Sequence, residues 1–376
     1  MPDDYITEDD MAFCGYNRLM STPRPFLQYL ESYATESQPH LEAFLAAHAQ
    51  TARDADPRSG EIMDHFITLS KGGKRLRGAL MKLGYEMMGG KDTEKILKAS
   101  IATEILHTSL LIHDDIMDRD IRRRGIVTMH EYYRDMYTNR TDDAPHVGVA
   151  TAISGGDIGI FLAFLALSES HLEPQYVQRA VQIMGSYGAM TGYGQALDMF
   201  HMYDAEGTID MVLKVYKYKT AYYTGVMPLQ IGAVLAGQTD QKIIETLKSY
   251  GESFGWAFQI QDDILGTFGD AKTTGKSDVS DIIEGKRTVL LLEFLQRADA
   301  AQRHLAGRVV GNPQASDSDI HQLLQAMRDT GALQSSIDLG WEYVHKAEKL
   351  VTQLTTDTHT QLIMHDAVQY MMERVQ

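Results

Sequence analysis

The chain has 376 residues, of which 44% are hydrophobic and only 9 are proline. This length allows one large domain or two average ones, and the apolar share is too high for a disordered chain. The formal net charge of −16 argues against general nucleic-acid binding, which requires a basic surface to neutralise phosphates. The single cysteine, Cys14, excludes a disulfide scaffold and a cysteine-based zinc site, and it is compatible with the cytoplasmic location that we expect.

The N-terminal residues are acidic, and MPDDYITEDD lacks the basic and then apolar order of a signal peptide. We expect residues 1–22 to form a loose tail and residues 23–376 to form one domain. The longest uninterrupted apolar run, IGIFLAFLAL at 158–167, has about half the length of a bilayer span. The sequence therefore predicts a buried helix at this run and a soluble protein without a membrane span.

Helical periodicity dominates the rest of the chain. Stretches that lack proline and are rich in Ala, Leu, Met, Glu and Lys favour long helices. The apolar spacing predicts helices over about 26–52, 93–117, 156–171, 175–203, 208–236, 240–266, 281–298, 317–329 and 335–374. Polar residues at 133–146 predict an exposed loop, and a break is expected around 306–318. Strand-like alternation is nearly absent, so the predicted fold is all-α.

The segment His107–Gly125, HTSLLIHDDIMDRDIRRRG, combines acidic and basic residues. Asp114 and Asp118 are four residues apart, so on a helix both carboxylates lie on one face. Such carboxylates suit magnesium, which proteins usually bind through one or two carboxylates and the phosphate oxygens of a substrate. Guanidinium groups, which suit phosphate oxygens, follow at Arg122, Arg123 and Arg124. Taken alone, the segment is equally consistent with a solvated acidic helix end before a basic loop.

A second acid pair, Asp262 and Asp263, ends the apolar run of AFQIQDDILGTFGD, about 150 residues after the first pair. Because each pair ends an apolar helix, the two pairs could face each other across one cavity. Between them, Lys219 and Thr220 lie in an otherwise apolar helix, where a lysine must reach solvent or find an anion. The second pair therefore favours a metal-bridged diphosphate site over a solvated surface.

Two further segments place basic residues directly after glycines. KGGKRLRG carries Lys74 and Arg77 on one helix face, and TTGKSDVSDIIEGKRT carries Lys276 and Lys286. Glycines permit a tight turn, and the start of a helix offers N–H groups to an anion. An ordinary basic helix start and a solvated loop are the alternatives at these two places.

In order and spacing, these segments resemble those of the polyprenyl diphosphate synthase family, the trans head-to-tail isoprenyl diphosphate synthases. The matching motifs are GGKRLRG, the first Asp-rich motif (DDxxD) with RRG, GQALD, the KT pair, FQIQDD and GK…EGKRT, between about Gly72 and Thr288. The resemblance implies an all-α, single-domain isoprenoid-synthase-type helical bundle around a deep central cavity, with its motif-bearing core at about 70–290. It also implies a homodimer and bound Mg²⁺, three ions in the family.

The resemblance assigns a role to each matching residue. The metal ligands would be Asp114, Asp118 and Asp262, and the supporting carboxylates would be Asp115 and Asp263. Isopentenyl diphosphate would be bound by Lys74, Arg77, His107 and Arg124. The allylic diphosphate would be bound by Arg123, Lys219, Thr220, Gln259 and Lys276. Besides the metal ligands, Lys219 and Gln259 would act in catalysis.

The implied reaction condenses isopentenyl diphosphate with an allylic diphosphate to give a longer all-trans prenyl diphosphate. On a helix ending at Asp114, Ser109 and Leu110 would lie one turn below the reacting site. Family members that stop at farnesyl commonly have an aromatic residue at the place matched by Ser109. Serine leaves that volume open down to Leu106, so geranylgeranyl (C20) or a somewhat longer product is expected. Leu110 is bulky enough to narrow the channel, which keeps farnesyl as an alternative.

Two departures from the family pattern leave other classes open. Gly266 stands where the second motif usually has its third aspartate, and Asp270 would replace it if the helix continues. Gly78 stands where many relatives have proline. A terpene cyclase shares metal-assisted ionisation, but it has no acceptor diphosphate for the predicted basic residues to hold. A non-catalytic subunit of a two-component synthase would be expected to lose metal ligands, and Gly266 is the one hint of such a loss.

Overall fold

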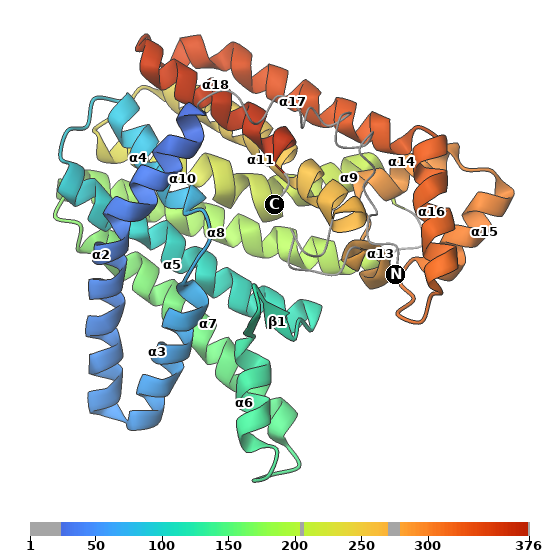
Figure 1. The fold of residues 1–376 in the computed structure, drawn as a ribbon. Coiled ribbons are helices and arrows are strands. Elements are labelled where there is room, and N and C mark those ends of the chain that lie inside the picture. The colour runs from blue at the N-terminus through green and yellow to red at the C-terminus, as the bar shows by residue number, and fades with distance from the viewer. Residues whose placement is uncertain (1–23, 204–206, 270–278, 375–376) are drawn as a thin grey trace. The chain divides into compact units, whose positions relative to one another are not determined.

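The computed structural model describes residues 24–203, 207–269 and 279–374 (Figure 1). The predicted acidic tail and the residues Asp270 and Lys276 lie outside the described residues. The chain forms two compact units. One unit comprises residues 28–184 and 228–239, and the other comprises the described parts of 1–27, 185–227 and 240–376. The prediction of one domain over 23–376 stays a prediction.

The unit that begins at residue 28 is built around α5 and α7. Its elements, some of which continue into the other unit, are α2 (Pro25–Ala55), α3 (Pro57–Ser70), α4 (Leu76–Met87), α5 (Thr93–Asp118), β1 (Arg122–Arg123), β2 (Ile126–Val127), α6 (Met129–Tyr137), α7 (Ala144–Ser168), α8 (Pro174–Tyr203) and α10 (Met227–Leu235). α5 packs along α7, and α3, α4 and α6 also contact this pair. α5 is apolar on most sides and largely buried, as its sequence predicts.

Glycines of α7 allow α5 to approach closely. A Cβ atom at Gly156 would stand 2.8 Å from Cε1 of His113, and a Cβ atom at Gly159 would stand 2.7 Å from Cζ of Phe66 and closer still to the Ser109 hydroxyl. Any larger residue would push the helices apart, because contacts this short do not occur between real side chains. The glycines therefore fix the position of the α5 segment that leads to the first acid pair.

The other unit is organised by α11. Its further elements are α9 (Ile209–Val215), the π-helix η2 (Tyr216–Val226), α11 (Gln241–Phe268), α13 (Ser280–Glu284), α14 (Val289–Arg297), α15 (Ala300–Val309), α16 (Asp317–Asp329), α17 (Ala332–Leu354) and α18 (Thr358–Glu373). α11 packs against η2 and against α17, and α17 and α18 run side by side (Figure 1). A separate apolar cluster joins the end of α11 to α14, α15 and α16.

A stripe of small residues brings η2 against α11. A Cβ atom at Gly251 would stand 2.7 Å from Cα of Val226, and a Cβ atom at Gly255 would stand 2.5 Å from Cβ of Ala221. Val226 and Ala221 are five residues apart, which is the spacing of hydrogen bonds in a π-helix. π-helical segments are rare and concentrate at functional sites, so η2 is a candidate for carrying functional residues.

The predicted helices over about 26–52, 93–117, 175–203 and 317–329 are confirmed within a few residues. The exposed loop predicted at 133–146 is wrong in part, because α6 extends to Tyr137 and α7 begins at Ala144. α6 is held by aromatic contacts: Tyr133 is buried, and the Tyr132 ring stacks on His65 with centroids 4.4 Å apart.

Two long predicted helices are interrupted. The helix expected over 281–298 is divided into α13 and α14, because Gly285 adopts a left-handed conformation with φ of 77° and ends α13. The helix expected over 335–374 is divided into α17 and α18. There the Asp357 carboxylate accepts a hydrogen bond from the backbone N–H of Thr360 and starts a new helix.

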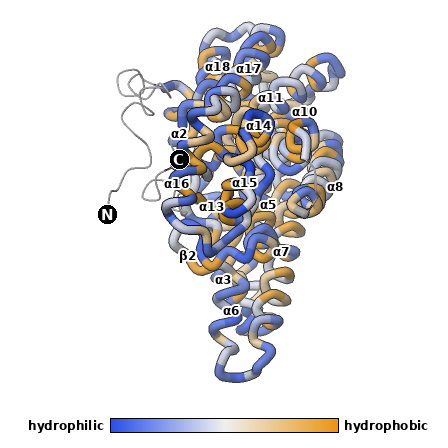
Figure 2. Tube along the Cα trace, turned by 90° about the vertical axis from the view of Figure 1, so that its right-hand side faces the viewer, coloured by the Kyte–Doolittle hydropathy of each residue, from blue (hydrophilic) through white to orange (hydrophobic). Residues whose placement is uncertain are grey.

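α7 differs from the buried helix that its sequence predicts. By length and composition it could cross a membrane, and only 33% of its 18-residue apolar stretch is buried. One such helix among the described residues is weak evidence for a membrane span, since core helices also satisfy this test. Leu162 and Leu167 are buried, but one face exposes Ile153, Phe161 and Leu165, with Phe161 74% exposed. Figure 2 shows the hydrophobic residues that recur along α7. The prediction is therefore wrong for this face.

Candidate active site

The first acid pair lies at the end of α5. Asp118 is the last helical residue, and the following Arg119 adopts a left-handed conformation with φ of 59°. Asp114 and Asp118 are four residues apart on the same face, and both are partly exposed. The helix therefore presents two carboxylates in the arrangement that the sequence predicts.

Asp115 points to a different environment, where it is 1% exposed. Nε of Arg123 donates a hydrogen bond of 2.6 Å to Oδ1 of Asp115, and its Nη2 lies 3.7 Å from Oδ2 of Asp114. Burial raises the pKa of Asp115 to about 7, although the charge of Arg123 opposes the shift. Arg123 thus lies beside both neighbouring carboxylates, and Asp115 acts as its buried partner.

A short hairpin positions the two predicted arginines. Arg122 pairs with Val127 and Arg123 with Ile126 across β1 and β2. The connecting residues Arg124 and Gly125 have φ values of 51° and 78°, which is the conformation of a two-residue type I′ turn. The RRG sequence therefore forms a tight turn that returns the chain after the acid segment.

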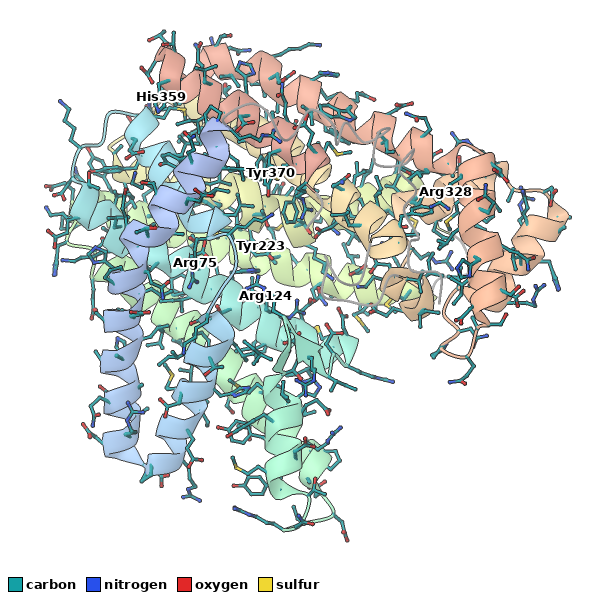
Figure 3. All side chains as sticks on the ribbon, in the orientation of Figure 1. Arg75, Arg124, Tyr223, Arg328, His359 and Tyr370 are labelled. Atoms are coloured by element: carbon teal, nitrogen blue, oxygen red, sulfur yellow. The ribbon has the colours of Figure 1, made fainter. Side chains whose placement is uncertain are left out.

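Basic side chains gather between α4, α5 and this hairpin. A Cβ atom at Gly73 would stand 2.9 Å from Nη1 of Arg124. Arg75 and Arg124 are labelled in Figure 3. Burial, and then the charges of Arg77, Arg124, Arg123 and Arg75, lower the pKa of His107 well below its usual range. Burial, and then the charges of Arg123 and Arg77, lower the pKa of Arg124. Mutual repulsion of this kind favours an anion, and the cluster joins three of the four residues predicted to bind isopentenyl diphosphate.

Arg75 belongs to the same cluster, although it was not among the residues predicted from the sequence. Gly72, Gly73 and Arg75 have positive φ values, so the chain turns tightly before α4 begins at Leu76. Arg75 is 7% exposed, and its Nη1 lies 4.0 Å from Oε2 of Glu104. Lys74, by contrast, is exposed on the turn. Arg75 could have been found from the KGGKR motif, but its inward direction depends on the left-handed backbone.

Gly78 has a local explanation. Its Cβ atom would stand 2.5 Å from Cζ of Tyr33 and closer still to the phenolic oxygen. Tyr33 is 1% exposed, and its hydroxyl donates a hydrogen bond of 2.8 Å to Oγ of Ser100. The backbone N–H of Gly78 donates a hydrogen bond of 2.8 Å to Oε1 of Glu104. The tyrosine thus fills the space that a larger residue would need.

Asp262 of the second acid pair forms an ion pair with Arg374 near the end of the chain. The Asp262 side chain is 43% exposed, whereas that of Arg374 is 8% exposed. Nη2 of Arg374 also donates a hydrogen bond of 2.8 Å to the carbonyl oxygen of Phe258, and its Cζ lies 4.1 Å from the centroid of that ring. No sequence pattern identifies Arg374, because its contact is specified only by the folded chain.

Asp263 lies in a buried hydrogen-bond network that includes two predicted substrate-binding residues. The Thr220 hydroxyl donates a hydrogen bond of 2.7 Å to Oε1 of Gln259, and Nε2 of Gln259 donates one of 2.9 Å to Oδ1 of Asp263. The hydroxyl of Tyr216, the first residue of η2, donates to Oδ2 of Asp263. Burial, and then the charge of Asp281, raise the pKa of Asp263 well above its usual range. The network fixes the orientation of the Gln259 amide.

Lys219 of η2 has a carboxylate partner on α8. Its Nζ lies 2.6 Å from Oδ2 of Asp198, the aspartate of the GQALD motif. A Cβ atom at Gly194 would stand 2.7 Å from the carbonyl carbon of Tyr218. Because Gly194 has no side chain, α8 can approach η2 closely enough for this ion pair. The GQALD motif alone assigns no role to Asp198.

Near the described end of α11, a carboxylate from another helix lies over Gly266. A Cβ atom at Gly266 would stand 2.7 Å from Cγ of Asp281. Asp281 belongs to α13 and is 8% exposed. The segment that carries Lys276 is outside the described residues, and Lys286 lies 3.2 Å from Oδ1 of Asp281.

The predicted chain-length residues lie in different surroundings. Ser109 is fully buried, and its hydroxyl donates a hydrogen bond of 2.9 Å to the carbonyl oxygen of Ile105. It faces the contact of α5 with Gly159 and Phe66. Leu106 is 4% exposed, and Leu110 is half-buried. The volume that serine was predicted to leave open is therefore taken up by α3 and α7. The influence of these residues on the chain length of the product stays a prediction.

The carboxylates of α5 fit magnesium. Among the residues that the structure describes, no group of three or more His, Cys, Asp and Glu side chains is placed to hold a metal ion. Two carboxylates on one face of α5, beside a cluster of guanidinium groups, match an ion that keeps positions for phosphate oxygens and water. On α5, Asp114 and Asp118 are the residues that would hold it, and the predicted role of Asp262 as a further ligand stays a prediction.

Comparison with known proteins gives one consistent result. The family model described as polyprenyl synthetase matches residues 58–327. A geranylgeranyl diphosphate synthase of Saccharolobus solfataricus is 32% identical over 300 residues, covering 78% of this chain and 84% of that protein. A geranylfarnesyl diphosphate synthase of Aeropyrum pernix is 31% identical over 315 residues, covering 82% of this chain and 92% of that protein.

Solved structures give the same answer for the fold. A geranylgeranyl pyrophosphate synthase from Corynebacterium glutamicum, complexed with isoprenyl diphosphate and magnesium, has a TM-score of 0.86 and is 29% identical. The match covers 92% of this chain and 99% of that chain. The predicted all-α isoprenoid synthase fold is confirmed. The ordered motifs, the geometry of the acidic and basic segments and these matches agree. The chain belongs to the polyprenyl synthetase family.

Proposed function

We propose that the chain is a magnesium-dependent trans-prenyltransferase that condenses isopentenyl diphosphate with an allylic diphosphate. The product is an all-trans prenyl diphosphate of C20 or longer. The observation that carries the proposal is the cluster of the cationic Arg75, Arg77 and Arg124 around the neutral His107, beside the acid pair of α5. This cluster gives an acceptor diphosphate a site separate from the carboxylates, which a terpene cyclase does not need.

In this reaction the bond between the allylic carbon and its diphosphate oxygen breaks, and the isopentenyl double bond forms a new carbon–carbon bond. A proton then leaves the resulting cation, and the departing diphosphate accepts it. Bound Mg²⁺ would stabilise the negative charge of the departing diphosphate, with Asp114, Asp118 and Asp262 as its carboxylate ligands.

The chain's own residues bind and orient the substrates. Arg123 is held beside Asp114 by its hydrogen bond to Asp115, and Lys219 is held by Asp198, so both cations are positioned before an allylic diphosphate arrives. Fixed charges of this kind stabilise a leaving group without reorganisation. The neutral imidazole of His107 offers one N–H to the acceptor without adding to the repulsion among the arginines.

The exposed face of α7 supports a homodimer. Ile153, Phe161 and Leu165 expose apolar side chains along one helix, and a second copy of the chain would cover them. A homodimer is therefore part of the proposal, as is the cytoplasmic location that the sequence led us to expect.

The decisive experiment incubates the purified chain with Mg²⁺, labelled isopentenyl diphosphate and each allylic primer in turn, followed by analysis of product length. A labelled product of C20 or longer supports the proposal. A cyclic hydrocarbon formed without isopentenyl diphosphate would identify a cyclase instead. A folded chain that makes no product alone would point to a non-catalytic subunit.

A further inference from the structure

Tyr216 carries a buried hydroxyl that joins three helices. It is the first residue of η2 and is 5% exposed. Its hydroxyl donates a hydrogen bond to Oδ2 of Asp263 on α11, and it accepts one of 3.1 Å from the backbone N–H of Val289, the first residue of α14. That N–H cannot be paired within its own helix, because the first N–H groups of a helix have no carbonyl one turn before them. The hydroxyl therefore both donates and accepts, and water has little access to replace it.

Tyr216 is connected to Gln259 through Asp263. Gln259 and Asp263 are four residues apart on α11, and Tyr216 and Thr220 are four residues apart on η2, so the four side chains form two facing pairs. Nε2 of Gln259 donates a hydrogen bond of 2.9 Å to Oδ1 of Asp263, and the Thr220 hydroxyl donates one of 2.7 Å to Oε1 of Gln259. Because Tyr216 holds one oxygen of Asp263, it also fixes the direction of the other oxygen, which faces the amide.

The orientation of the Gln259 amide depends on this carboxyl group. If the amide turned by half a rotation, its oxygen would face Oδ1 of Asp263, where two acceptors repel each other. Its NH₂ group would then face the Thr220 hydroxyl. Asp263, held by Tyr216, therefore keeps the amide oxygen on the side of Thr220. Gln259 is half-buried, so the amide is partly shielded from water that could compete for these hydrogen bonds.

We propose that Tyr216 is a positioning residue for ionisation of the allylic diphosphate and acts through Asp263 on Gln259. The amide oxygen of Gln259 has a second lone pair, which is available to the positive charge that develops on the allylic carbon. A dipole that is oriented beforehand stabilises such charge without reorganisation. The inference rests on the proposed function, because it places Gln259 beside the allylic substrate. The Tyr216 hydroxyl thus affects the chemical step although it touches no substrate.

The test is a double-mutant cycle of Tyr216→Phe and Gln259→Met. Tyr216→Phe removes a single oxygen, and Gln259→Met removes the amide while it keeps the length of the side chain. The wild type, both single variants and the double variant are mixed with Mg²⁺, farnesyl diphosphate and labelled isopentenyl diphosphate, and rapid quenching measures the rate of a single turnover. Steady-state assays measure KM for isopentenyl diphosphate, and urea unfolding measures stability.

Tyr216→Phe should lower the single-turnover rate by about tenfold or more, since a small misplacement at a reacting centre costs up to about a hundredfold. KM for isopentenyl diphosphate should stay within about twofold, because the acceptor site is not involved. In the Gln259→Met background the same change should alter the rate by less than about threefold, because the amide that it positions is absent. Tyr250→Phe is the matched control: it removes another buried α11 contact, a hydrogen bond of 2.8 Å to the carbonyl oxygen of Met364. It should lower stability as Tyr216→Phe does and keep the rate within about twofold.

A wild-type single-turnover rate in Tyr216→Phe would overturn the inference, and so would an equal loss of rate with and without the Gln259 amide. A loss of rate in Tyr250→Phe as large as that in Tyr216→Phe would leave Tyr216 a structural role only. Replacement of Tyr216 with 4-aminophenylalanine keeps an N–H donor and decides the question if Tyr216→Phe does not fold. The inference requires that replacement to retain the wild-type rate within about threefold. Absence of condensation in the wild type would instead refute the proposed function.

Discussion

Replacing Asp115 with Asn should make the free energy of unfolding less sensitive to a rise in pH between about 4 and 8. Burial raises the pKa of Asp115 from an ordinary 3.8 to about 7. A carboxyl group with a raised pKa contributes its stability below the unfolded pKa and loses it as the pH rises through the folded pKa. The difference of roughly three pKa units corresponds to about 4 kcal/mol of unfolding free energy, lost between about pH 4 and pH 8.

The assay is urea unfolding of the wild type and Asp115→Asn at several values between about pH 4 and pH 8.5, with a chelator present. Asn keeps an oxygen that accepts the hydrogen bond from Nε of Arg123, so the comparison isolates ionisation of the carboxyl group. The variant should gain stability relative to the wild type as the pH rises, approaching about 4 kcal/mol.

Asp120→Asn is the control, because it removes another carboxylate partner of Arg123, whose Nη2 lies 3.3 Å from Oδ2 of Asp120. The stability of this variant relative to the wild type should change much less over the same range, because burial, and not the charge of Asp120, is the largest cause of the raised pKa of Asp115. If the free-energy difference between Asp115→Asn and the wild type stays constant within about 1 kcal/mol, Asp115 does not titrate near neutral pH and the reasoning is refuted.

Asp114→Ala and Asp262→Ala should each lower kcat by orders of magnitude with an unchanged circular dichroism spectrum, because each serves charge that develops in the transition state. Near wild-type kcat in either variant would contradict the metal assignment. Arg77→Ala should chiefly raise KM for isopentenyl diphosphate, and Lys219→Ala should chiefly impair use of the allylic substrate, in assays that vary one substrate at a time. Equal effects on both substrates would show that the two sites are not separate. Ser109→Phe should lower the unfolding free energy by about 1–3 kcal/mol, since the ring must displace α7, and its product should be shorter; wild-type stability and wild-type products would place the floor elsewhere.

The helices that the apolar spacing predicts are those whose own residues determine them. α5 is apolar on most sides and contains no proline, so its course follows from local sequence alone. The break at Gly285 and the helical residues up to Tyr137 were missed, because apolar spacing does not register a left-handed glycine or the stacking of Tyr132 on a distant His65.

The candidate site was likewise predicted from the sequence only in part. Its acidic and basic segments were found from the sequence, because the chemistry of metals and diphosphates needs particular residue types at short spacing. Their partners were not found. Arg374 is 112 positions from Asp262, and Asp198 meets Lys219 only because Gly194 lets two helices approach. Such contacts are set by the tertiary fold, which no local pattern specifies.

The packing of Tyr33 on Gly78 restricts the order in which this part of the chain can evolve. The ring of a proline at position 78 would meet the buried tyrosine, and its missing N–H would take a hydrogen bond from Glu104. A chain that gains proline here would need a smaller residue at position 33, and the cavity left by that change costs about 2–5 kcal/mol. A spare margin of stability therefore decides whether such an exchange can occur.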